Sequence, residues 1–217
     1  MQRSLIPLVC VLLCAAVLGT GCMSSSGAQA AGTPAPVTTA AAHSALSSLA
    51  LVPSDMPAGS VLVSAKEKTS DDVSSMAKDL GWQAGYVAVF TLPSNSTAPT
   101  TVTHSLAYYA GRSMSDIVPL ISNNERQEKD LVFSDLTPTA TGTDTRTFAA
   151  AANTSQKAAS VVATNAMGIS SESAAPEGYI ETVFGKGGVI EVIRISGPGA
   201  QYDTLASLAQ TAYAKTN

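Results

Sequence analysis

Ser75 and Lys78 have the spacing of the nucleophile and the lysine in Ser-x-x-Lys hydrolases. In a helix this spacing places the hydroxyl one turn from an amine, which can activate it. Enzymes of this kind also carry Ser-Asp-Asn and a downstream Lys-Thr-Gly, and the sequence contains neither. Residues 68–70, Lys-Thr-Ser, come before the serine. We therefore interpret Lys78 as a solvent-facing residue of an amphipathic helix.

His104 is a second candidate for acid–base chemistry, because imidazole titrates near neutral pH. It alternates with apolar residues of the same predicted strand face, namely Val102, Leu106 and Tyr108. This setting favours a neutral histidine that is hydrogen-bonded at the edge of a core. We predict no catalytic residue, and a hydrolase with a hydroxyl nucleophile is the alternative.

The cysteines and histidines do not form a metal-binding pattern. Cys10, Cys14 and Cys22 all lie near the N-terminus, so the rest of the chain has no thiol for a disulfide, a metal or catalysis. The other histidine, His43, is not spaced with His104 and carboxylates as metal ligands would be. We predict neither a metal nor any other cofactor.

Composition argues against nucleic acid as a partner. Charged residues make up 13% of the 217 residues, and the formal net charge is −4. Binding to phosphate backbones requires a basic surface, which this balance does not provide. The surface should be weakly charged and rich in hydroxyl groups.

Three aromatic residues, Trp82, Tyr86 and Phe90, are spaced by four, which suits one face of a helix or of a strand. The β-branched residues between them and Pro93 favour a central strand over residues 83–92 that is apolar on both faces. Residues 100–109 alternate, so the two segments predict a hairpin. A pocket on this hairpin would bind a small ligand through aromatic and imidazole side chains. The candidate residues are Trp82, Tyr86, Phe90, His104 and Tyr108.

The other elements complete an α+β fold, an antiparallel sheet with helices packed against it. A helix is predicted to begin at Ser70 and to end at Gly81, and we expect the charged residues 125–130 to be the solvated end of another. That helix has the apolar stripe Met114, Ile117, Val118 and Ile121. A terminal helix has the stripe Leu205, Leu208, Ala209, Ala212 and Tyr213. Further strands are expected at residues 60–66, 131–133, 143–150, 158–166, 179–184 and 189–195.

The N-terminus has the pattern of a secretory signal. Arg3 precedes an apolar run over residues 5–18 that is too short for a permanent membrane span. Residues 18–22, Leu-Gly-Thr-Gly-Cys, resemble a lipobox, which implies cleavage and lipid attachment at Cys22. Stable anchoring needs at least two acyl chains, such as a diacylglyceryl group with palmitate. The alternatives are an ordinary signal peptide cut near residues 28–31 and an uncleaved anchor.

These features divide the chain into three parts. Residues 1–21 are predicted to be the lipoprotein signal peptide, residues 22–43 a disordered lipidated tether, and residues 44–217 a single extracytoplasmic domain. The tether is uncharged and rich in small residues that cannot form a core. Asn95 and Asn153 begin sequons in predicted loops and are possible glycosylation sites.

The predicted domain resembles a group of secreted prokaryotic lipoproteins. The segments that carry this resemblance are residues 51–59, residues 79–86 and the closing hairpin with its helix. Their domains are similar to the PsbP-like and LpqN-like αβ sandwich, which implies binding or assembly outside the cytoplasm and supplies no catalytic residues. We therefore predict a non-enzymatic, membrane-anchored lipoprotein that binds a small ligand or an envelope protein. A purely structural surface protein is a further alternative.

Overall fold

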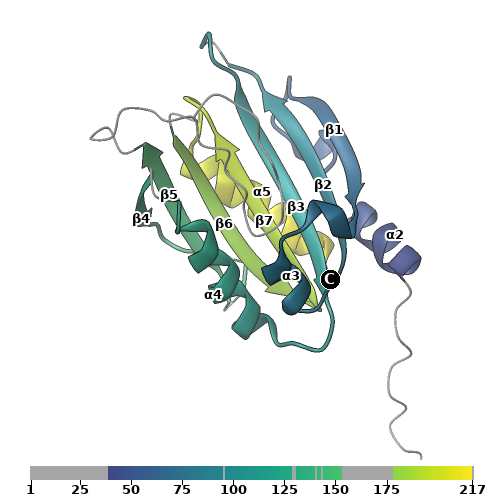
Figure 1. Ribbon diagram of the computed structural model, residues 1–217. Helices are drawn as coiled ribbons and strands as arrows, with labels where there is room; N and C mark the ends of the chain where they lie inside the picture. The colour runs from purple at the N-terminus through teal and green to yellow at the C-terminus, as the bar shows by residue number, and fades with distance from the viewer. Residues whose placement is uncertain are drawn as a thin grey trace, which may run out of the picture. The chain divides into compact units, whose positions relative to one another are not determined.

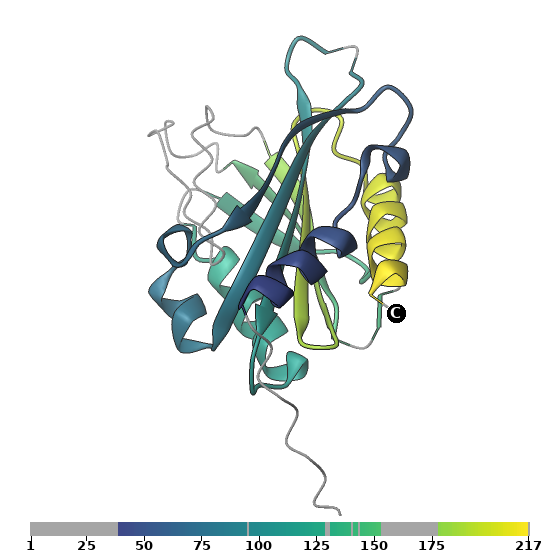
Figure 2. The same cartoon turned by 90° about the vertical axis from the view of Figure 1, so that its right-hand side faces the viewer.

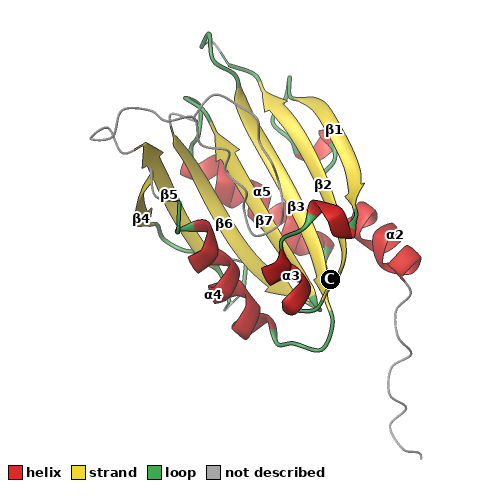
Figure 3. Ribbon diagram, viewed as in Figure 1, coloured by secondary structure: helices red, strands yellow, loops and turns green. Residues whose placement is uncertain are grey.

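The computed structural model describes residues 39–94, 96–128, 131–139, 141–142, 144–152 and 178–216. All of them belong to one compact unit of the chain, residues 37–217. Their strands form a single sheet with helices against it, as Figures 1 and 3 show, and this confirms the predicted α+β class. A predicted strand at residues 158–166 lies outside the described residues.

The sheet has seven strands in the order β1-β2-β3-β7-β6-β5-β4, and every neighbouring pair is antiparallel. Both predicted hairpins, β2–β3 and β6–β7, are confirmed. The strands are β1 (Val61–Lys68), β2 (Trp82–Leu92), β3 (Thr100–Tyr109), β4 (Leu131–Asp135), β5 (Arg146–Ala152), β6 (Gly178–Lys186) and β7 (Val189–Ser196).

Helices cover the sheet on both sides, which makes three layers. Figure 2 shows the sheet nearly edge-on, with α4 on one side and α5 on the other. The helices are α2 (Thr39–Leu49), α3 (Ser75–Asp79), α4 (Met114–Glu125) and α5 (Tyr202–Lys215), with short 3-10 turns at η1 (Pro53–Asp55) and η2 (Ser70–Asp72).

We call the side under α3 and α4 the α4 face. Ile117, Val118 and Ile121 of α4 are fully buried there against apolar strand residues such as Val183 and Ile190. The predicted stripe of α4 thus forms its core contact, because residues three and four apart share one side of a helix. Pro119 lies within this helix.

We call the opposite side the α5 face. Leu205, Leu208, Ala209 and Ala212 of α5 pack there with Phe90 and other strand residues. Beside them, Leu46 of α2 packs on the β2–β3 hairpin. The predicted stripe of the terminal helix is confirmed by this contact.

Helix α2 begins at Thr39, inside the segment predicted to be a tether. Ala42 and Leu46 are buried, with 4% and 1% of their surfaces exposed. This contact with the sheet stabilises a helix that composition alone did not indicate.

The helix predicted to begin at Ser70 is split in two. Residues 70–72 form the 3-10 turn η2, where the Asp72 carboxylate accepts the backbone N–H of Thr69. The α-helix α3 begins five residues after Ser70, with Ser74 as its N-cap accepting the N–H of Ala77. Gly81 follows the helix with a φ of +92°, as expected for a C-terminal glycine.

A β-bulge separates Trp82 from the rest of β2, because the register with β3 shifts between Trp82 and Ala84. Trp82 therefore packs on the α4 face, whereas Tyr86 and Phe90 pack on the α5 face. Its indole lies over Gly85, where an added Cβ would come within 3.2 Å of the indole nitrogen. The prediction that spacing by four puts these three aromatics on one strand face is wrong for Trp82.

Candidate functional site

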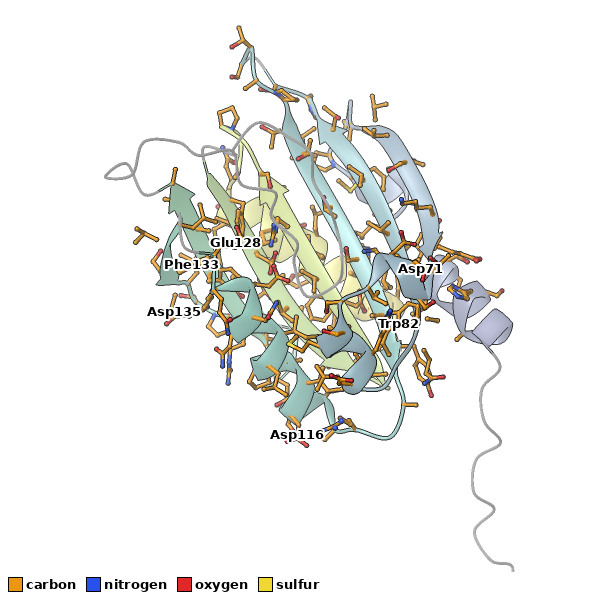
Figure 4. The ribbon with its side chains drawn as sticks, viewed as in Figure 1. Asp71, Trp82, Asp116, Glu128, Phe133 and Asp135 are labelled. Carbon is orange, nitrogen blue, oxygen red and sulfur yellow. The ribbon has the colours of Figure 1, made fainter. Side chains whose placement is uncertain are left out.

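The predicted ligand-binding residues are divided between the two faces of the sheet. Tyr86, Phe90, His104 and Tyr108 lie under α2 and α5, while Trp82 lies beside α3 (Figure 4). Phe90 and His104 have 0% exposure. None of these five residues lines the pocket described below.

His104 belongs to a closed hydrogen-bond network on the α5 face. Its Nδ1 accepts the backbone N–H of Leu51 at 3.1 Å, so its Nε2 carries the proton and donates to Glu191 Oε2 at 3.0 Å. The other oxygen of Glu191 accepts the hydroxyl of Thr216 at 2.5 Å. Both ring nitrogens are thus used, and the imidazole has no lone pair left to accept a proton from a nucleophile.

The Ser-x-x-Lys pair lies on α3, where Ser75 and Lys78 are both exposed. His104 is on the opposite face of the sheet, so it is not near this serine. Cys22, Asn95 and Asn153 lie outside the described residues.

A polar pocket of about 370 Å³ lies beside the C-terminal half of α4, and we call it the α4 pocket. Its lining comes from α4, the end of β4, the segment after β4 and the start of β5. The lining residues are Ser122, Asn123, Arg126, Asp135, Leu136, Pro138, Thr145, Arg146 and Thr147.

Hydroxyl groups hold the segment after β4 against the sheet. Thr182 Oγ1 is 2.9 Å from Thr139 Oγ1 and 3.0 Å from Thr147 Oγ1, and the backbone N–H of Leu136 donates to the Thr147 carbonyl. These bonds fix one wall of the α4 pocket.

Two guanidinium groups and one carboxylate set the charge of the pocket lining. Arg126 forms an ion pair with Asp135, and its guanidinium carbon lies 4.7 Å from the ring centre of Phe148. The Nε–H of Arg126 is buried and donates to no group of the described residues. Arg146 is exposed at the pocket and donates to the carbonyl of Thr145. The lining therefore has an excess positive charge.

Beneath α4, an arginine joins two buried carboxylates. Arg194 of β7 donates from Nε to Glu181 Oε2 at 2.5 Å and from Nη2 to Glu125 Oε2 at 2.8 Å. Its guanidinium carbon lies 3.9 Å from the ring centre of Tyr179. Glu128 follows α4 and lies in front of the sheet in Figure 4. We call Glu125, Glu128, Tyr179, Glu181 and Arg194 the carboxylate cluster.

Three polar atoms of this cluster are buried without a hydrogen bond from any described residue. They are one oxygen of Glu181, one oxygen of Glu128 and the phenol oxygen of Tyr179. Glu181 is 0% exposed and Tyr179 is 2% exposed. Buried polar groups normally have partners, and leaving one without a partner is costly.

Burial and like charge shift the titration of these groups. Burial raises the pKa of Glu181 and of Glu128, and the nearby Arg194 opposes the rise in each case. Burial also raises the pKa of the Tyr179 phenol. For Arg194, burial acts to lower the pKa, but the carboxylates of Glu181 and Glu125 outweigh it and raise the pKa.

Lys68 of β1 adds a second cation near this cluster. It is 3% exposed, and burial lowers its pKa to about 8, against the opposing effect of carboxylates including Glu125. The five residues of the carboxylate cluster thus include three carboxylates and one guanidinium, and Lys68 is a second cation near Glu125. No group of three or more histidine, cysteine or acidic side chains in the described part of the chain could hold a metal ion.

The expectation that residues 125–130 are only a solvated helix end is wrong for Glu125, which is 1% exposed. It lies four residues after Ile121, so it continues the apolar stripe of α4 into the core. The spacing of Glu125 from Ile121 is thus the feature of the sequence that indicates its burial. Glu181 and Arg194 show a weaker indication of burial, because each is a charged residue within an apolar strand.

Comparison with known proteins supports the fold. No protein-family model and no curated protein sequence matches the chain. The structure is similar to the extracellular domain of PknH from Mycobacterium tuberculosis, with a TM-score of 0.53 over 81% of this chain and 96% of that chain. The two sequences are 10% identical, so the similarity concerns the fold alone. The PsbP-like and LpqN-like resemblance stays a prediction.

Proposed function

We propose that the chain is a lipid-anchored, extracytoplasmic domain that binds a small anionic ligand in the α4 pocket and catalyses no reaction. The lipobox-like residues 18–22 and the similarity to an extracellular domain support the location. Among the described residues, no helix is both long and apolar enough to cross a membrane.

The observation that carries the ligand proposal is the presence of two guanidinium side chains, Arg126 and Arg146, in the lining of one pocket with a single carboxylate, Asp135. An arginine side chain presents donors in a plane that matches the oxygens of a carboxylate or phosphate. The polar residues Ser122, Asn123, Thr145 and Thr147 complete the lining. A small ligand with one negative charge would complement the excess positive charge.

Thermal unfolding of the detergent-solubilised full chain tests the ligand proposal. Inorganic phosphate, acetate and succinate are the probes, because a ligand that binds the folded state raises the Tm with its concentration. We expect at least one anion to raise the Tm, and Arg126→Gln to remove the effect. Arg112→Gln is the control, since it removes the same charge at an exposed position outside the pocket. The proposed site would be refuted if both variants lost the anion-induced rise in Tm equally, or if no anion raised the Tm of the wild type.

Lipid attachment is tested by metabolic labelling with a fatty acid. We expect the wild type to be labelled and to fractionate with membranes, and Cys22→Ala to be unlabelled. A labelled, membrane-bound variant would contradict anchoring at Cys22.

A second candidate function is the binding of a partner protein along β1. Among the described strands, this edge strand pairs only with β2, and Val61, Leu62 and Val63 are 62%, 41% and 61% exposed. An edge strand with apolar side chains can accept a strand from another chain. If Leu62→Lys abolishes cross-linking to an envelope protein while anion binding persists, this function is favoured.

A further inference from the structure

We propose that the carboxylate cluster binds the ammonium group of a primary amine. The site is distinct from the α4 pocket, because none of its five residues lines that pocket. The inference is therefore independent of the proposed anion binding.

The first argument is the number and type of free atoms. Glu181, Glu128 and Tyr179 each present a buried oxygen that receives no hydrogen bond from the described residues. Two of the three are carboxylate oxygens, which can only accept when ionised. An alkylammonium group has three N–H donors and no acceptor, so it supplies what these atoms lack.

The second argument is proximity. The guanidinium of Arg194 bonds Glu181 at 2.5 Å and lies 3.9 Å from the ring centre of Tyr179, so both side chains meet at one group. Glu128 lies close enough to this group for the charges of Arg194 and Glu181 to act on its pKa, and for its own charge to help raise the pKa of Tyr179. Glu128 is half-buried and Arg194 is 14% exposed, so the cluster reaches the surface at these two side chains.

The third argument is charge. Within the carboxylate cluster, three glutamates lie near one arginine, Arg194, so these five side chains have a net negative charge that suits a monocation. A second guanidinium would need a wider planar set of acceptors, and a metal ion is disfavoured by the arginine already held between two of the carboxylates. A compact ammonium group matches both the charge and the three acceptors.

Titration calorimetry of the detergent-solubilised full chain with n-butylammonium tests this site. The comparison probes are 1-butanol, which lacks the charge, and butyltrimethylammonium, which has the charge without N–H donors. We expect butylammonium to bind at least about tenfold more tightly than either, as the loss of charged hydrogen bonds predicts. Affinity should weaken on acidification, since protonation of Glu128 and Glu181, whose pKa values are raised, removes the acceptors' charge.

Two variants and a control locate the binding. Glu181→Gln should weaken butylammonium binding by about tenfold or more, and Tyr179→Phe by a few fold. Glu67→Gln, at an exposed glutamate of β1, should change nothing. If Glu181→Gln fails to fold, Tyr179→Phe decides the question, because it removes one oxygen without breaking an ion pair. Equal binding of 1-butanol, no binding of the amine, or unchanged affinity in the folded variants would overturn the proposal.

Discussion

The two faces of the sheet each bury a glutamate bonded to a basic side chain, but they differ in how completely the polar atoms are paired. On the α5 face, Glu191 accepts from His104 and Thr216, and His104 accepts from Leu51. On the α4 face, Glu181 accepts from Arg194 with one oxygen, and no described residue donates to the other.

This difference separates a structural network from a binding site. The α5-face network joins β3, β7, α5 and the segment after α2, and it needs nothing further. In the carboxylate cluster, the unpaired buried atoms lower the stability of the fold. Native proteins retain such atoms where a bound ligand or another function compensates for this free-energy cost. The predictions below test whether the faces differ in this way.

The largest effect is expected from Arg194→Met. It leaves Glu181 and Glu125 buried without their shared cation, and breaking a buried ion pair in this way costs about 3–5 kcal/mol. Urea unfolding at neutral pH measures the free energy. The control Arg112→Met, at an exposed residue, should stay within about 0.5 kcal/mol of the wild type. A loss below about 1 kcal/mol for Arg194→Met would mean that the cluster is not held together by this residue.

Glu191→Gln should cost about 2 kcal/mol, because the amide nitrogen of glutamine would face a donor from His104 or Thr216. The same urea experiment measures this loss. Butylammonium binding should be unchanged, since the network lies on the other face. Weakened amine binding in this variant would show that the two faces are coupled.

Lys68→Met should change how stability depends on pH. The folded-state pKa of Lys68, about 8, is below its ordinary value of 10.5, so the unfolded chain holds more protons between these values. Wild-type stability should therefore rise from pH 8 to 10.5, with this group contributing about 1 kcal/mol per pH unit. The variant should lack this contribution, while the exposed control Lys78→Met keeps it. Identical pH profiles for all three proteins would contradict the lowered pKa.

The smallest changes in stability are expected when one hydroxyl is removed from each face, and they should differ in sign. Tyr179→Phe removes a buried hydroxyl that bonds to none of the described residues, so stability should be unchanged or rise by up to about 1 kcal/mol. Thr216→Val removes the bonded hydroxyl on Glu191 and should cost about 1 kcal/mol. Differential scanning calorimetry resolves both. Equal losses would erase the proposed contrast between paired and unpaired groups.

Local periodicity was enough to predict most of the fold. Alternation over residues 100–109, the Gly-rich turn at residues 185–188 and the stripe of the last helix all depend on contacts within one element. Trp82 was placed on the wrong face because a bulge depends on the pairing of two strands rather than on spacing within one.

The carboxylate cluster was not predicted, although Glu125 continued a visible helical stripe. Glu181 and Arg194 are cross-strand partners, and their pairing follows from the register of β6 and β7. The contact of Arg194 with Glu125 further requires α4 to pack over that pair. Such a contact joins segments far apart in the chain, so no local pattern contains it.

The last turn of α5 also determines how the domain would carry a mechanical load. Lys215 donates to the carbonyl of Ala50 at 3.0 Å and forms an ion pair with Asp55. These two contacts bind the end of α5 to the segment between α2 and β1. A pulling force applied to the chain on the N-terminal side of Thr39 would be transmitted through α2 to the contacts of Lys215. These contacts would have to break before the force could separate β1 from β2. Without the last turn of α5, the segment between α2 and β1 would lose these contacts, and the force needed to unfold the domain would be lower.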